Sequence, residues 1–115
     1  MVNFSTFKKL ALSFPETGEQ PHFEKTSFRV SKKIFATYDK VNNRACLKLS
    51  EKDQDIFSLF DKTIIYPVPN KWGKQGWTNM ELKKVPKEMC KDALTAAYND
   101  VAPKKLKVVT KTENK

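Results

Sequence analysis

Apolar residues recur at helical spacing near both ends of the chain. Near the start, the apolar positions form one stripe made up of Phe4, Phe7, Leu10, Ala11 and Phe14. Near the end, Pro86 precedes a second run made up of Met89, Cys90, Ala93, Leu94, Ala97, Tyr98 and Val101. This spacing is typical of helices that place one face in a core. Asn3 can cap the first helix and Pro15 ends it, while Pro86 suits the start of the last one.

Short runs of aromatic and aliphatic residues follow the first helix. Residues 27–30, 34–38 and 45–49 are separated by turn-like polar segments, so they predict a three-stranded antiparallel meander. Residues 15–26 hold two prolines, a glycine and three glutamates, and we expect an irregular loop there.

The second half of the chain predicts one more helix and two more strands. Ser50 opens a near capping box for a helix over 51–61. Residues 64–68 read as a strand that its prolines confine to an edge, and residues 77–85 offer the last strand. The resulting order predicts an α+β fold in two layers, with an antiparallel sheet and helices on one face.

Length and composition fit one domain without a membrane span. The 115 residues suit a single domain, which we place at 1–103, followed by a basic, flexible tail at 104–115. There is no apolar run of about 18 residues, and lysines interrupt the N-terminal helix, so we expect neither a membrane span nor a signal peptide. Cys46 and Cys90 lie far apart and predict reduced packing thiols in a cytoplasmic protein.

Residues that carry chemistry are scarce. His22 is the only histidine, so neither a histidine triad nor a histidine-rich metal site can be built. No phosphate-binding or nucleophile motif occurs, and a solvated loop explains the glutamates of 15–26 better than a catalytic cluster. We therefore expect no enzymatic activity, no metal and no cofactor.

The strongest compositional feature is positive charge. The chain has 22 basic and 13 acidic residues, for a net charge of +9. Such an excess favours a polyanionic partner. Arg29 and Arg44 are the only arginines, and lysine suits phosphates better than it reads base edges, so we expect little sequence preference on DNA.

The charge gathers in two stretches, 31–50 and 71–91, which centre on predicted hairpins. The second contains the segment 71–77, in which two lysines, two glycines and two tryptophans alternate. An exposed tryptophan beside lysine can stack on a base. We expect Trp77 to point into the core, while Trp72 is as compatible with exposure as with burial. The clustering of lysines along the chain fits either a positive surface on the sheet side or lysines scattered separately in solvent.

Several segments in this order resemble the MmcQ/YjbR family of small bacterial proteins. They are Phe14-Pro15, Phe28-Arg29-Val30, Lys33-Ile34-Phe35-Ala36, Leu47-Lys48-Leu49-Ser50, Pro69, Gly73-Lys74-Gln75-Gly76-Trp77, Ala97-Tyr98 and Lys105-Leu106. The resemblance implies an α-β(3)-α-β(2)-α fold, also seen in secretion chaperones, and DNA binding through two hairpin "wings". Carried onto this chain, it implies DNA contacts from Lys32, Lys33, Arg44, Lys48, Lys71, Trp72 and Lys74.

Two functions from different classes follow from these observations. The first is a monomeric, non-enzymatic DNA-binding protein that uses lysine–phosphate contacts. The second is a chaperone-like protein-interaction module that binds an acidic peptide or partner. The salt dependence of binding distinguishes the two functions. DNA affinity falls steeply as the salt concentration rises, because added salt reduces the free energy gained from counterion release, whereas the affinity of an apolar protein interface changes little.

Overall fold

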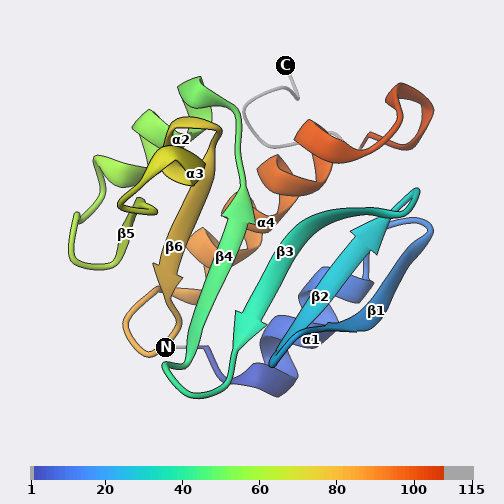
Figure 1. Cartoon of the computed structure of the whole chain (residues 1–115), viewed down its shortest axis with the longest axis horizontal. Coiled ribbons are helices and arrows are strands. Elements are labelled where there is room, and N and C mark those ends of the chain that lie inside the picture. Colours follow the sequence, from blue (N-terminus) through green and yellow to red (C-terminus); the bar gives the residue numbers. More distant parts are fainter. Residues whose placement is uncertain (1, 108–115) are drawn as a thin grey trace.

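The computed structural model of the chain, shown in Figure 1, describes residues 2–107. Its elements are α1 (Phe4–Leu12), β1 (Thr17–His22), β2 (Lys25–Val30), β3 (Lys33–Asp39), β4 (Arg44–Lys48), α2 (Glu51–Ser58), β5 (Ile65–Pro67), α3 (Lys71–Lys74), β6 (Trp77–Glu81), α4 (Lys87–Val101) and the 3-10 helix η1 (Lys104–Leu106). Within these residues, six strands form one sheet in the order β1-β2-β3-β4-β6-β5, and every neighbouring pair is antiparallel. The predicted α+β class is therefore confirmed.

The three predicted helices, α1, α2 and α4, begin within one residue of the positions that the sequence predicts. The Asn3 side chain accepts a hydrogen bond of 2.8 Å from the amide of Thr6 at the start of α1. The Ser50 hydroxyl accepts one of 3.1 Å from the amide of Asp53 at the start of α2. Each cap satisfies an amide that has no partner within its helix. α4 begins directly after Pro86.

One face of the sheet carries the core. Cross-strand pairing aligns two rows of buried side chains on this face. The first row is Tyr38, Ala45, Met80 and Ile65, and the second is Phe28, Ala36 and Leu47. From α1, the ring of Phe7 meets that of Phe28 at 5.7 Å, and from α4, the ring of Tyr98 meets that of Phe35 at 5.6 Å. Both helices therefore cover the same face, as predicted.

The strand count differs from the prediction, because part of the segment 15–26 is a strand and not a loop. β1 pairs with β2 along its whole length, from Thr17 opposite Val30 to His22 opposite Lys25. Four strands rather than three thus precede α2. β1 lies at the edge of the sheet, where backbone hydrogen bonds to β2 hold it, and it buries none of its side chains. Its sequence therefore lacks the alternation of apolar and polar residues by which a strand is predicted. An edge position also tolerates Pro21.

The later elements are shorter than predicted. β5 is the other edge strand, as its prolines imply, and β6 ends at Glu81 instead of continuing to 85. Part of the predicted tail is helical, since η1 follows α4 and Leu106 packs against the core. The rest of that tail, 108–115, lies outside the described residues. No helix between residues 2 and 107 has the length and apolarity needed to cross a membrane.

Candidate nucleic-acid interface

Antiparallel pairing distributes the connections between two ends of the sheet. The Lys32 end, as we call it, comprises the β2–β3 turn (residues 31–32), the end of β4 at Lys48, and α3. The Val41 end comprises the β1–β2 turn (23–24), the β3–β4 turn (40–43) and the connection from β6 to α4 (82–86). In Figure 1 the Lys32 end lies at the top and the Val41 end at the bottom.

The β2–β3 turn holds two exposed lysines in a constrained backbone. Ser31 and Lys32 both have positive φ, at 50° and 69°. Two such residues in succession give the hairpin turn that matches the twist of its strands, although glycine or asparagine is the usual occupant. Lys32 and its neighbour Lys33 are exposed. The turn therefore presents two cations at a defined position beyond the sheet.

The segment Lys71–Trp77 forms a short helix followed by a strand, which corrects the expectation that Trp72 lies in a loop within a hairpin. Asn70 caps α3 by accepting a hydrogen bond of 2.8 Å from the amide of Trp72. A Cβ on Gly73 would lie 1.9 Å from the carbonyl oxygen of Val68, so only glycine allows α3 to fold back on the end of β5. This close approach fixes where the α3 side chains emerge.

α3 displays both of its lysines and half of its tryptophan. Lys71 and Lys74 are exposed, and 50% of the Trp72 surface is accessible. The ammonium of Lys71 lies 5.7 Å from the centre of the Trp72 ring, within the range of cation–π attraction. Trp77 is half-buried on the face opposite the core, because its neighbour Thr78 takes the core side of β6, so the predicted core role is wrong.

Two residues of the predicted set are already paired with carboxylates. Arg44 Nε donates to Glu81 Oε2 at 2.8 Å, and the Tyr66 hydroxyl donates to the same oxygen. Burial and then this hydrogen bond raise the pKa of Tyr66, so the phenol stays protonated. Lys48 Nζ lies 3.1 Å from Asp100 Oδ2. The charge of each cation is therefore offset by a carboxylate in the unbound protein.

The structure brings most, but not all, of the predicted residues to one end. The residues at the Lys32 end are Lys32, Lys33, Lys48, Lys71, Trp72 and Lys74. Arg44 begins β4 and therefore lies at the Val41 end, so it is not part of this group. The β2–β3 turn and α3 are separated by the width of β4 and its neighbours, about 14 Å at the usual strand spacing. Figure 1 shows β3 and β4 diverging toward this end, which widens the gap.

Three further lysines belong to the same end and were assigned by sequence to the tail. The Tyr98 hydroxyl donates to the carbonyl of Pro15 at 2.7 Å, and Asp100 binds Lys48, so the last turn of α4 reaches the Lys32 end. The residues that follow it include three exposed cations, which are Lys104, Lys105 and Lys107. The sequence shows these lysines as a basic run, but only the position of α4 shows at which end of the sheet they lie.

No candidate metal-binding cluster accompanies these cations in the described part of the chain. Residues 2–107 contain no cluster of three or more histidine, cysteine, aspartate or glutamate side chains that could hold a metal ion. His22 ends β1, with its ring 4.8 Å from that of Phe23. Cys46 and Cys90 are both free thiols. Cys90 is buried, as expected of a packing residue, whereas Cys46 is only half-buried.

Comparison with known proteins supports the assignment of the fold. The chain resembles the crystal structure of the Deinococcus radiodurans protein DR2400, described as a DUF419 domain, with a TM-score of 0.78 at 22% identity, over 98% of this chain and 86% of that one. No curated protein is significantly similar to it. The YjbR family model matches residues 12–100, which is most of the chain. The chain therefore belongs to the YjbR family.

Proposed function

We propose that this protein is a non-enzymatic DNA-binding domain that holds the duplex backbone with lysines of the Lys32 end. The observation that carries the proposal is a group of exposed lysines from two separate places, Lys32 and Lys33 at the β2–β3 turn and the start of β3, and Lys71 and Lys74 on α3. The ion pairs found within residues 2–107 involve Lys8, Arg44 and Lys48, so none of these four lysines is neutralised by a carboxylate.

The chemistry of these side chains favours phosphate contacts over base reading. Lysine acts as a flexible point charge, and bidentate recognition of guanine favours arginine. Each phosphate contact releases counterions, which gives an affinity that depends steeply on salt and weakly on sequence. The β2–β3 turn is a hairpin of the kind that the family resemblance implies for a wing, whereas the second group of lysines comes from the helix α3 and not from a hairpin.

Charge reversal tests the proposal directly. Lys32→Glu, Lys33→Glu and Lys74→Glu together should lower the affinity for a fluorescent 20-base-pair duplex more than tenfold and reduce the salt slope by about three units. The matched control is Lys83→Glu, Lys84→Glu and Lys87→Glu, three exposed lysines at the Val41 end and the start of α4. An equal or larger loss in the control would refute the Lys32 end as the site, and the protein-interaction function would then be the better account of the charge.

Trp72 adds a second test within the same site. Because only unpaired bases offer a free face for stacking, Trp72→Ala should weaken binding to single-stranded DNA more than to duplex DNA. A stacked base is worth about 1–3 kcal/mol, so the expected loss on single strands is at least fivefold. Equal losses on both substrates would show that Trp72 supports α3 and does not stack on bases.

A further inference from the structure

A groove runs along α2 on the side of the molecule that carries β5. Two cavities, of about 460 and 530 Å³, lie between α2 and the segment 62–74. They share Asp55 on the helix and Pro67 on the strand, so the two cavities adjoin along the groove. The charges along it are mixed, with Glu51 and Asp55 on the helix and Lys62 and Lys74 on the opposite wall.

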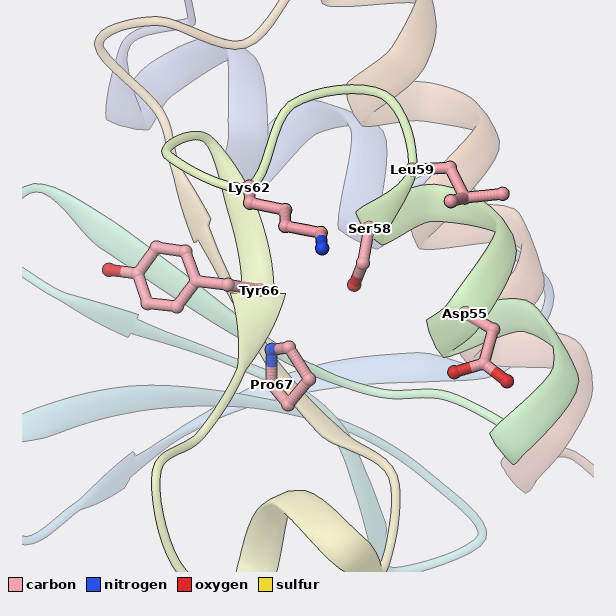
Figure 2. A pocket seen from close by; sticks show the side chains of 6 residues that line it. All are labelled: Asp55, Ser58, Leu59, Lys62, Tyr66 and Pro67. Carbon is pink, nitrogen blue, oxygen red and sulfur yellow. The ribbon is translucent and has the colours of Figure 1, made fainter.

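The first cavity contains an unsatisfied donor beside a cation. Ser58 Oγ is the one buried side-chain oxygen or nitrogen in residues 2–107 without a hydrogen-bond partner. Lys62 is exposed and makes no ion pair with the residues described. Figure 2 shows the Ser58 hydroxyl and the Lys62 ammonium reaching into the same space from α2 and from the loop before β5, while the ring of Tyr66 points away. A hydroxyl and an ammonium converging on one point together suit a carboxylate.

Exposed apolar residues lie at the end of α2, and one of them, Leu59, lines the groove. Leu59, which lines the first cavity, is 79% exposed, and Ile56 on the same helix is 52% exposed. Phe60 follows them at 47%. Three large apolar side chains that remain this exposed at the end of one short helix are typical of a surface that contacts another protein.

The shape fits an extended chain better than a compact small molecule. Sites for small ligands enclose most of the ligand surface. Here the residues around the first cavity are largely exposed, which leaves it open along one side. The eight residues of α2 span about 12 Å, a length that three or four residues of extended peptide would cover.

We propose that the groove along α2 binds an extended peptide segment of a partner protein, with one acidic side chain on Ser58 and Lys62 and an adjacent apolar side chain against Leu59. Asp55 lies one turn before Ser58 on the same helix wall and repels a second acid, so the fitting segment carries a single acidic residue among apolar ones. Lys74 lines the second cavity and also belongs to the proposed DNA site, but Ser58, Leu59 and Lys62 do not, so peptide binding at the first cavity requires no DNA binding.

A titration followed by NMR tests the proposal with a defined probe. The probe is the capped pentapeptide of sequence alanine-leucine-glutamate-leucine-alanine, added to the isotope-labelled full chain without DNA. We expect saturable shifts of the Ser58, Leu59 and Tyr66 amides, with a dissociation constant on the order of 0.1–1 mM. The same peptide with glutamine in place of glutamate should bind at least fivefold more weakly.

Variants separate this site from general effects of charge and folding. Lys62→Glu and Ser58→Ala should each weaken the peptide at least threefold, and Ser58→Ala should leave thermal stability unchanged or raised because it removes an unpaired hydroxyl. The control is Lys52→Glu, an exposed lysine on α2 that does not line the groove. Absence of saturable shifts at these amides, equal binding of the two peptides, or equal losses in the control would each overturn the proposal. Shifts of the same amides by duplex DNA in place of the peptide would also overturn it.

Discussion

The side chain of Gln54 on α2 donates a hydrogen bond of 2.9 Å to the carbonyl oxygen of Gly73 on α3. The same nitrogen lies 3.1 Å from Thr78 Oγ1 on β6. Gln54 is only 7% exposed, so these bonds form out of contact with water. One buried amide therefore holds together three elements, and it sets the position of α3 and of the lysines that α3 displays.

Gln54→Glu should destabilise the protein strongly. The substitution keeps the shape but replaces the donating nitrogen with an oxygen that faces the Gly73 carbonyl, and burying such an unpaired charge costs about 3–5 kcal/mol. Urea denaturation measures the change as a lower midpoint. The control is Gln75→Glu, at an exposed position two residues after Gly73. If both variants unfold at the same urea concentration, the clamp between α2 and α3 contributes nothing to stability.

Gly76→Ala should also be poorly tolerated. Gly76 has a φ of +107°, and a Cβ there would lie 1.9 Å from the carbonyl oxygen of Leu49. Backbone strain of this kind costs about 1–3 kcal/mol before the clash is relieved, so we expect a total loss of about 3 kcal/mol or more. Gly18→Ala is the matched comparison, since nothing lies within 4 Å of its added methyl. Thermal unfolding should show Gly18→Ala near the wild-type midpoint, and a similar midpoint for Gly76→Ala would contradict the geometry.

The two thiols should react slowly in the folded protein. Burial raises the pKa of Cys46 to about 11 and that of Cys90 to about 12. The thiolate is the reactive form, so at pH 8 both groups are almost entirely in their unreactive protonated state. At pH 8, iodoacetamide labelling followed by mass spectrometry should modify both thiols only after denaturation. When the pH of the native protein is raised, half-buried Cys46 should be labelled before Cys90. Rapid native labelling of Cys90 at pH 8 would disprove its placement in the core.

The three longer helices could be predicted because their sequence signals are local. The apolar stripe of α1 and the caps at Asn3 and Ser50 depend on residues only a few positions apart. β1 could not be predicted in this way, since its side chains are not buried and its stability comes from pairing with β2. Its turn also lacks the usual glycine or asparagine, because exposed Phe23 occupies the position with a φ of 60°.

In the candidate site, too, features set by local sequence could be predicted and features set by distant contacts could not. The exposure of Lys32 and Lys33 follows from a turn that the local sequence predicts. The neutralisation of Arg44 and Lys48 does not, because their partners Glu81 and Asp100 lie 37 and 52 residues away. Contacts at that separation are created by the pairing of β4 with β6 and by the packing of α4, so charge counted along the chain overstates the cations available to a ligand.

This difference leads to a prediction about which cations bind DNA. Neutralising Arg44 and Lys48 together, as Arg44→Gln and Lys48→Gln, should change the salt slope of duplex binding by less than about half a unit, because each must first break its carboxylate pair to reach a phosphate. Neutralising Lys32 and Lys33 should reduce the slope by nearly two units, since neither has a carboxylate partner. Fluorescence anisotropy between low and moderate salt measures both slopes on the same duplex. Circular dichroism should first establish that each double variant remains folded at the assay temperature. A slope reduced equally by the two pairs would mean that the ion pairs open on DNA, and Arg44 would then have to be placed in a contact surface that extends to the Val41 end.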